Sequence, residues 1–292
     1  ARMIISGIEF LDEIPFKDVY FTSILRDSTG RKLSKSLGNS PDPIELFEKY
    51  GTDATRFSIM LMSPQGSDVY FSENGLEIGR NFMNKIWNAS RFIMINHDES
   101  FSDTLDKDSL DIYDKWILAK LDTTLEKVDV HYGNYQFNEA IKVIYDFTWN
   151  EFCNWYIEIA KIKFNSSNKT EKNNAFLVSK EVLKKVLLIL HPIAPFITEE
   201  IWSYLKNETD EDIIISSWPT LRTQGLPYDN DKVVSMKEVV VAIRTIRSEL
   251  NVPPTKKINA SIAIKNAEDA SLFHSLKSMI CLLYTSDAAD EP

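Results

Sequence analysis

Apolar side chains recur along most of the chain at intervals of three, four and seven residues, the spacing that gathers them on one face of an α-helix. This periodicity starts after residue 72 and predicts helices over residues 76–94, 110–128, 137–159, 178–190 and 195–205. Only short polar connections separate these segments. Helices joined in this way favour an antiparallel bundle, so the chain is predicted to be mostly α-helical.

Other stretches follow different patterns. Residues 1–8 resemble the last turns of a helix, and a near-continuous apolar run over residues 19–25 predicts a strand buried on both faces of a parallel sheet. Residues 213–219 predict a short extended link. Part of a small α/β module is predicted from a helix over 233–250, an alternating strand over 257–264 and a helix over 267–279.

A basic loop is predicted between the apolar run and the next helix. Residues 30–39 place Lys32, Ser34, Lys35 and Ser36 between two glycines. Lysines that reach a departing diphosphate lower the barrier to its release, and serine hydroxyls add donors to phosphate oxygens. This pattern favours phosphate chemistry, and a solvated surface turn is the alternative.

Capping residues predict two short helices after the loop. Asp42 suits the N-cap and Pro43 the first position of one helix, which Gly51 would end. Asp53 is predicted to cap a second helix over residues 54–62. The loop is therefore expected to lead directly into ordered structure.

Composition narrows the possible classes of protein. The 292 residues are 43% hydrophobic and 11% aromatic, enough for a large core in two or three domains. The net charge of −10 argues against coating nucleic acid by charge alone, although it allows local basic patches. Two cysteines and four scattered histidines lack metal-ligand spacing, so we expect no metal site.

The sequence also bears on location. No apolar stretch is long enough to cross a membrane, and the first 15 residues are acidic where a signal peptide would be basic. We therefore expect a cytoplasmic protein without a membrane partner.

Several motifs in order resemble class I aminoacyl-tRNA synthetases. Residues 30–39 resemble the KMSKS loop of that class, with Leu33 in place of methionine, and residues 51–57 resemble the segment that follows the loop. The remaining motifs are more similar to valyl- than to leucyl- or isoleucyl-tRNA synthetases, and they occupy residues 67–92, 149–158, 191–202 and 243–254.

The resemblance implies an enzyme that uses ATP and Mg²⁺ to activate L-valine and transfers it to tRNA(Val). It implies that Lys35 is the catalytic cation that contacts ATP, that Lys32 assists, and that Ser34 and Ser36 belong to the ATP site. It also implies a monomeric parent protein. The alternatives are an isoleucyl- or leucyl-tRNA synthetase fragment, a stand-alone tRNA-binding helical module, or a scaffolding protein without a ligand.

The same resemblance divides the chain into segments. We expect the C-terminal remnant of a Rossmann-type catalytic domain over 1–29, the KMSKS loop with a stem-contact segment over 30–72, an anticodon-binding helical bundle over 73–226, a partial α/β junction module over 227–280, and a non-native tail over 281–292. The HIGH motif and editing domain of the family are not found, so we expect this fragment to be inactive alone.

Four basic residues are candidates for tRNA contact. Arg80, Lys85 and Arg91 lie on the first predicted bundle helix, where the alternative is a solvated helix face. Arg56 is expected either to contact tRNA or to pair with Asp53. Four tryptophans are assigned to the core, as opposed to base stacking, because they fall in the periodic stripes: Trp87, Trp149, Trp155 and Trp202.

Overall fold

The computed structural model describes residues 1–102, 104–207, 210–220 and 228–253 together with residues 256, 258, 261, 277 and 280. The expected strand over 257–264, the helix over 267–279 and the tail over 281–292 lie outside this described part or touch it only at single positions. None of the helices in the described part is both long and apolar enough to span a membrane.

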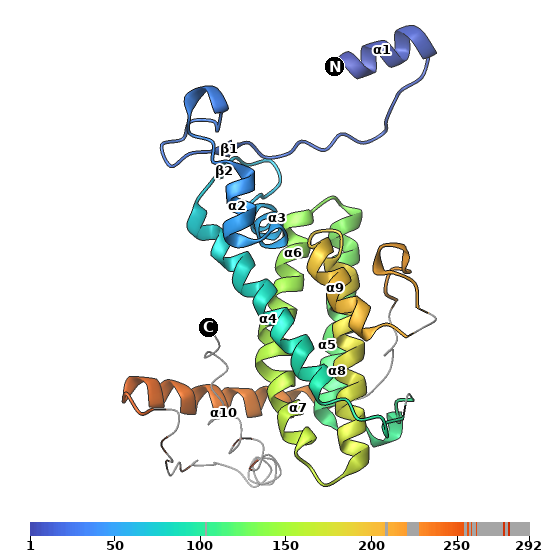
Figure 1. Ribbon diagram of the computed structural model, residues 1–292, viewed down its shortest axis with the longest axis vertical. Helices are drawn as coiled ribbons and strands as arrows, with labels where there is room; N and C mark the ends of the chain where they lie inside the picture. The colour runs from blue at the N-terminus through green and yellow to red at the C-terminus, as the bar shows by residue number, and fades with distance from the viewer. Residues whose placement is uncertain are drawn as a thin grey trace.

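Helices dominate the described part of the chain, where the sheet consists of two short strands (Figure 1). The N-terminal elements are α1 Arg2–Leu11, β1 Leu25–Arg26, η1 Lys35–Leu37, α2 Pro43–Tyr50, α3 Thr52–Leu61, β2 Val69–Tyr70 and η2 Glu73–Gly75. The bundle elements are α4 Leu76–Ile95, η3 Lys107–Ser109, α5 Ile112–Gly133, α6 Phe137–Asp146, the π-helical segment Phe147–Tyr156, α7 Ile157–Phe164, α8 Lys169–Leu190, α9 Pro195–Leu205, η5 Ile213–Ile215 and α10 Asn230–Glu249.

The predicted antiparallel bundle is confirmed. Figure 1 shows α4, α5, the helix running from α6 to α7, and α8 lying lengthwise together, with α10 running crosswise at the lower half of the bundle and out to one side. Their apolar stripes meet in one continuous core, in which Trp116, Phe152 and Leu183 are almost completely buried. Burial of side chains this large is the main favourable contribution to the stability of the bundle.

Local capping explains where two of the long helices begin. The Asp111 side chain accepts hydrogen bonds from the backbone of Tyr113 and Asp114, and the Asp114 carboxylate accepts one from the Asp111 backbone, which forms a reciprocal capping box for α5. At the start of α8, the Asn168 side chain accepts hydrogen bonds from the backbone of Thr170 and Glu171, without the reciprocal bond.

The third bundle helix is longer than predicted and changes its winding. The α-helical periodicity predicts one helix over residues 137–159, whereas the structure continues to Phe164 and contains a π-helical segment of ten residues, Phe147–Tyr156, hereafter the π segment. The predicted period of 3.6 residues assumes a regular α-helix, so it does not reveal a segment in which the helical turns are wider.

The prediction of a strand buried on both faces is wrong for residues 19–25. Only Leu25 and Arg26 are paired, in parallel, with Val69 and Tyr70, and the side chains of Val19 and Phe21 are 56% and 78% exposed. A two-residue pairing covers neither face of the preceding segment. Within the described residues, Tyr20 instead packs its ring edge against Phe137 at the start of α6.

The predicted extended link over residues 213–219 is also partly wrong. Residues Ile213–Ile215 form a short 3₁₀ turn, with Ile213 buried and Ile214 74% exposed. A tight turn allows one of three consecutive isoleucines to reach the core, whereas a strand would alternate their directions.

Candidate functional site

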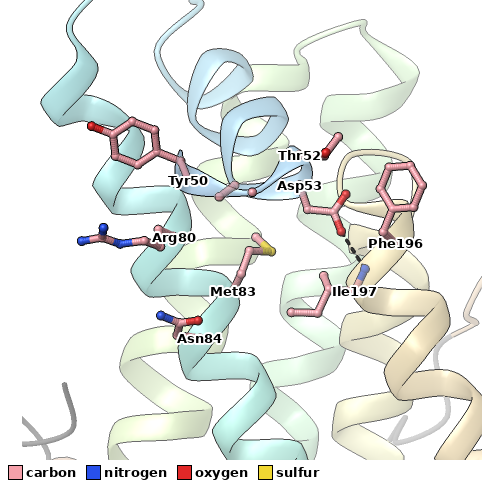
Figure 2. A pocket seen from close by; sticks show the side chains of 10 residues that line it. Tyr50, Thr52, Asp53, Arg80, Met83, Asn84, Phe196 and Ile197 are labelled. Atoms are coloured by element: carbon pink, nitrogen blue, oxygen red, sulfur yellow. Dashed lines mark hydrogen bonds between the residues drawn. The ribbon is translucent and has the colours of Figure 1, made fainter. Parts of the chain in front are cut away.

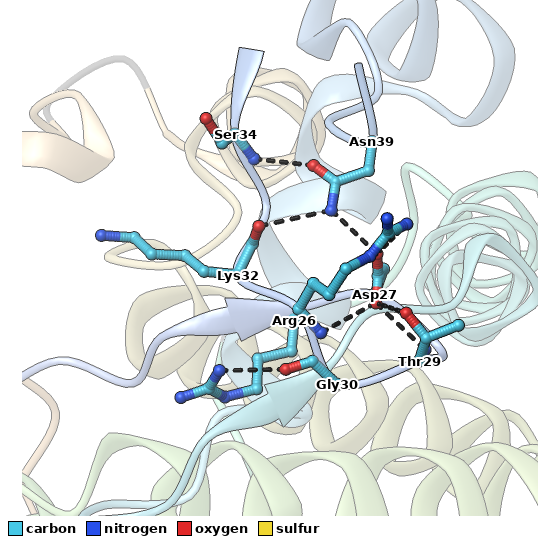
Figure 3. A network of polar contacts seen from close by, with 8 residues as sticks. Arg26, Asp27, Thr29, Gly30, Lys32, Ser34 and Asn39 are labelled. Carbon is cyan, nitrogen blue, oxygen red and sulfur yellow. Dashed lines mark hydrogen bonds and ion pairs between the residues drawn. The ribbon is translucent and has the colours of Figure 1, made fainter. Parts of the chain in front are cut away.

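The base of the loop over residues 30–39 is held by one aspartate (Figure 3). Asp27 accepts hydrogen bonds from Asn39 at 2.8 Å, from the Thr29 hydroxyl at 2.7 Å, and from the backbone and side chain of Arg31 at 2.9 Å. These bonds, with that from Asn39 the largest contribution, hold the pKa of the Asp27 carboxyl well below its usual value. The carboxylate therefore stays ionised and organises the turn around it.

Asn39 closes the loop by joining its two ends. Its side-chain nitrogen donates to Asp27 and to the Lys32 carbonyl, and its side-chain oxygen accepts from the Ser34 backbone at 2.9 Å. Figure 3 shows the Asn39 amide lying between Ser34 and Lys32 on one side and Asp27 on the other. The segment between Ser34 and Asn39 is thereby fixed at both ends and projects between them.

The loop over residues 30–39 presents the two predicted lysines to solvent. Lys32 and Lys35 are exposed, and within the part of the chain that the structure describes neither lies in an ion pair with a carboxylate. The Ser34 and Ser36 hydroxyls hydrogen-bond to each other at 2.7 Å. Gly38 ends the η1 turn with φ of 65°, a conformation that glycine adopts without strain. The loop thus brings all four predicted residues onto one small protrusion.

The short parallel pairing anchors this loop to the segment before α4. Leu25 pairs with Val69 and Arg26 with Tyr70. The Arg26 guanidinium bridges the two regions, because it donates to Asp68 at 2.6 Å and to the Gly30 carbonyl at 3.0 Å. Asp42 and Pro43 then start α2 as predicted, with Asp42 accepting from the Ile44 backbone.

Asp53 does not cap its own helix, which corrects the prediction. The helix α3 begins at Thr52 after Gly51, and the Asp53 carboxylate instead accepts from the Ile197 backbone in the first turn of α9, at 2.6 Å (Figure 2). Ala194, the residue at the N-cap position of α9, supplies no side-chain cap, so an aspartate 144 residues away satisfies that helix end. Burial raises the pKa of the Asp53 carboxyl.

Arg56 lies one helical turn after Asp53 on α3, and it binds the backbone between α8 and α9. Its guanidinium donates to the carbonyls of Ile193 at 2.9 Å and Pro192 at 3.3 Å. Asp53 and Arg56 therefore satisfy the N–H groups that begin α9 and the carbonyls that follow α8. We call this pair of contacts the α3–α9 clasp. No ion pair between the two side chains is found among the described residues.

A pocket of about 330 Å³ lies beside the clasp. Figure 2 shows Arg80 and Asn84 on its α4 side and Phe196 and Ile197 on its α9 side. The Arg80 guanidinium is 3.7 Å from the Glu77 carboxylate and 5.9 Å from the centre of the Tyr50 ring. The pocket therefore combines one partly paired cation, one amide and apolar walls.

The other two predicted RNA contacts follow Arg80 along α4. Lys85 is half-buried, with its ammonium 5.6 Å from the centre of the Trp149 ring, and Arg91 is exposed. The spacing of these residues along the helix spreads positive charge over most of its length. Within the described part, no group of three or more His, Cys, Asp or Glu residues is arranged to hold a metal ion.

Sequence reasoning missed the residues that organise the site. Asp27 with Gly30 three residues later has the signature of a tight turn with an aspartate side chain bonded to its own backbone, and this signal was available. Nothing local predicted that Asn39 would reach back to Asp27 or that Asp53 would cap α9, because both contacts depend on the folded chain.

Comparisons with known proteins agree with this architecture. Residues 114–264 match the family model of the anticodon-binding domain of tRNA ligase, and residues 1–72 match that of class I tRNA synthetases (I, L, M and V). The chain is 39% identical over 284 residues to a valine–tRNA ligase of Bacillus subtilis, and 38% identical over 304 residues to one of Aquifex aeolicus.

The extent of these matches is partial. The chain spans 32% of the Bacillus subtilis protein and 26% of the Aquifex aeolicus protein, while 96% and 100% of the chain is covered. Among solved structures, the LeuRS of Agrobacterium radiobacter K84 in a ternary complex with tRNA and LeuAMS matches 91% of the chain and 34% of that protein, with a TM-score of 0.60 and 18% identity. This structural similarity supports the fold alone. These family matches show that the chain belongs to the anticodon-binding domain family of tRNA ligases, and that a class I tRNA synthetase segment precedes the matching domain.

Proposed function

We propose that this chain is the part of a valine–tRNA ligase that carries the ATP-side loop and the tRNA-binding bundle. The observation that carries the proposal is the pairing of a braced loop, bearing two exposed lysines, with a bundle that matches the anticodon-binding model. In the whole enzyme, the valine carboxylate would attack the α-phosphorus of ATP and release pyrophosphate. The tRNA ribose hydroxyl would then take the valyl group and release AMP.

Within that reaction, Lys35 and Lys32 would act on the phosphates. Negative charge grows on the pyrophosphate as its bond to the α-phosphorus breaks, and a lysine ammonium offsets it best when already held nearby. The Asp27 and Asn39 contacts support this role by fixing both ends of the loop while leaving Lys35 exposed. Ser34 and Ser36 would donate to phosphate oxygens.

The described residues offer no metal site of their own, so they do not fit a resident Mg²⁺ ion. Mg²⁺ in proteins commonly enters such sites on the phosphates of a nucleotide. We therefore assign no residue of this chain to Mg²⁺.

The bundle would bind the phosphate backbone of tRNA(Val) through Arg80, Lys85 and Arg91 on α4. Arg56 is the least suited of the four candidates, because two of its guanidinium nitrogens donate to Pro192 and Ile193 carbonyls. Within the described residues, its two Nη1 hydrogens and the second Nη2 hydrogen are left for RNA. Arg80 and Arg91 lie three turns apart on one face of α4, whereas Lys85 lies about 140° around the helix beside Trp149. Cations placed in this way can neutralise RNA phosphates at more than one point.

The test is the affinity of the purified chain for transcripts of the tRNAs for valine, isoleucine and leucine. We expect the valine transcript to bind roughly 5-fold to 150-fold more tightly, the range expected from one good base contact. Replacement of Arg91 by alanine should weaken all three and lower the salt slope by about one.

Each alternative function gives a different outcome of this test. A stand-alone RNA-binding module would bind the three transcripts equally, and a scaffolding protein would bind none. Preference for the isoleucine or leucine transcript would reassign the amino acid while keeping the enzyme class. Any of these three results would overturn the proposal of a valine–tRNA ligase.

A further inference from the structure

A ladder of aromatic rings runs from the core of the bundle to its surface. Phe57 of α3 contacts Phe82 of α4 at 4.7 Å between ring centres, and Phe82 contacts Tyr145 of α6 at 5.0 Å. Tyr145 then stacks on Trp149, with ring centres 5.6 Å apart and ring planes inclined by 18°. The first two rings are fully buried, while Tyr145 and Trp149 are only half-buried.

The outermost ring of this ladder belongs to the π segment. Trp149 lies in its first turn, where the wider winding directs side chains differently from an α-helix. Of the four tryptophans predicted to be core residues, Trp155 and Trp202 are 9% and 4% exposed, whereas Trp87 and Trp149 are only half-buried, so that prediction is partly right. π-helical turns within α-helices occur frequently at functional sites.

One positively charged side chain lies beside Trp149, and two amide side chains share the helix face of that cation. The Lys85 ammonium lies 5.6 Å from the centre of the Trp149 ring. Asn81 and Asn88 stand four residues before and three residues after Lys85, which places them on the same face of α4. An aromatic ring beside a cation offers a nucleotide a stacking surface and a phosphate contact, and amides on the same helix face as that cation are suited to hydrogen bonds with a base edge.

We propose that Trp149 is a stacking platform for one unpaired base of the bound RNA. The base would replace Lys85 over the indole ring and extend the aromatic ladder by one member, and Lys85 would turn to the phosphate of the same nucleotide. The amides of Asn81 and Asn88 would reach the edge of the base. This inference rests on the proposed function, since it requires that the bundle binds tRNA.

The direct test is the affinity of the Trp149→Ala chain for the valine tRNA transcript. Loss of one base–aromatic stack should weaken binding about 5-fold to 150-fold. The slope of affinity against salt concentration should stay the same, because the indole carries no charge. Trp149→Phe should retain most of the affinity, since a phenyl ring also stacks.

Trp218→Ala is the matched control. Trp218 is 40% exposed and also rests on an aromatic ring, that of Tyr132 at 5.7 Å, and its indole nitrogen donates to Asp129. Its loss should leave affinity unchanged. If Trp149→Ala binds the transcript like the unaltered chain, the stacking proposal is overturned while tRNA binding stands. If the unaltered chain binds no RNA, both proposals fail.

A spectroscopic measurement covers the case in which Trp149→Ala does not fold. A base stacked on an indole quenches its fluorescence, so the unaltered chain should lose part of its tryptophan emission when the transcript binds. The Trp149→Phe chain, at saturating RNA, should lose markedly less. Equal quenching in both chains would contradict the proposal even without the alanine variant.

Discussion

The loop over residues 30–39 and the helical bundle are built by opposite means. Around the loop, ionised and polar side chains are exposed, and the hydrogen bonds of Asp27 and Asn39 fix the backbone. In the bundle, large apolar side chains are buried, and the buried Lys163 is paired with Asp111 and Asp114. The structure of the loop therefore suits the binding of a charged ligand, whereas the structure of the bundle provides a stable scaffold.

The α3–α9 clasp is where these two regions meet. The helix α3 follows the loop and α2 in sequence, and its Asp53 and Arg56 satisfy the backbone at the turn between α8 and α9. It also crosses α4 very closely, since a Cβ atom at Gly79 would overlap the Ala54 carbonyl. The loop is thus attached to the bundle through hydrogen bonds and a close helix crossing.

The largest expected effect on stability comes from the buried ion network of the bundle. Lys163 is 1% exposed and contacts Asp111 and Asp114, each at 2.7 Å. Lys163→Met leaves Asp114 buried without its cation, which should cost about 3–5 kcal/mol of unfolding free energy, as measured by urea denaturation. Lys35→Ala in the exposed loop should cost less than about 0.5 kcal/mol. Equal losses would erase the contrast between the two regions.

A smaller effect is expected at the clasp. Asp53→Ala removes the only side-chain cap found for α9 among the described residues and leaves its first N–H groups without that acceptor. We expect a loss of about 2 kcal/mol in thermal or urea unfolding. Asp42→Ala, which removes an exposed local cap, is the control and should cost about 1 kcal/mol. A loss at Asp53 no greater than at Asp42 would show that the clasp adds nothing to α9.

The smallest effect concerns the pH dependence of the loop. Because its pKa is lowered in the folded chain, the Asp27 carboxylate stabilises the loop above its unfolded pKa of about 3.9 and loses this contribution as the pH falls below that value. The Arg31 amide, which donates to Asp27, should therefore stay protected from hydrogen exchange at pH 5. Asp27→Ala, which removes the acceptor, should lose that protection at every pH, and a protected Arg31 amide in this variant would contradict the assigned role of the carboxylate.

Local patterns carried much of the fold but little of the site geometry. Apolar periodicity located the bundle helices, and Asp42 and Pro43 correctly marked the start of α2. The run over residues 19–25 misled, because apolar content alone does not provide the neighbouring strands that would bury it. Asp53 misled because a cap recognised by sequence position can serve a helix that is distant in sequence. The half-burial of Trp87 and Trp149 escaped prediction because periodicity assigns a residue to one side of a helix without showing how far the neighbouring helices cover it.

The division of roles between loop and bundle is tested most directly by valine-dependent exchange of pyrophosphate into ATP. The assay would use the Bacillus subtilis valine–tRNA ligase with its matching segment replaced by this chain, in a version that retains exchange activity. Lys35→Ala should lower exchange about 10²-fold to 10³-fold, as removal of one transition-state contact does elsewhere, and should leave tRNA affinity unchanged. Lys49→Ala, at an exposed lysine paired with Glu73, is the control. Undiminished exchange in the Lys35→Ala enzyme would contradict the account.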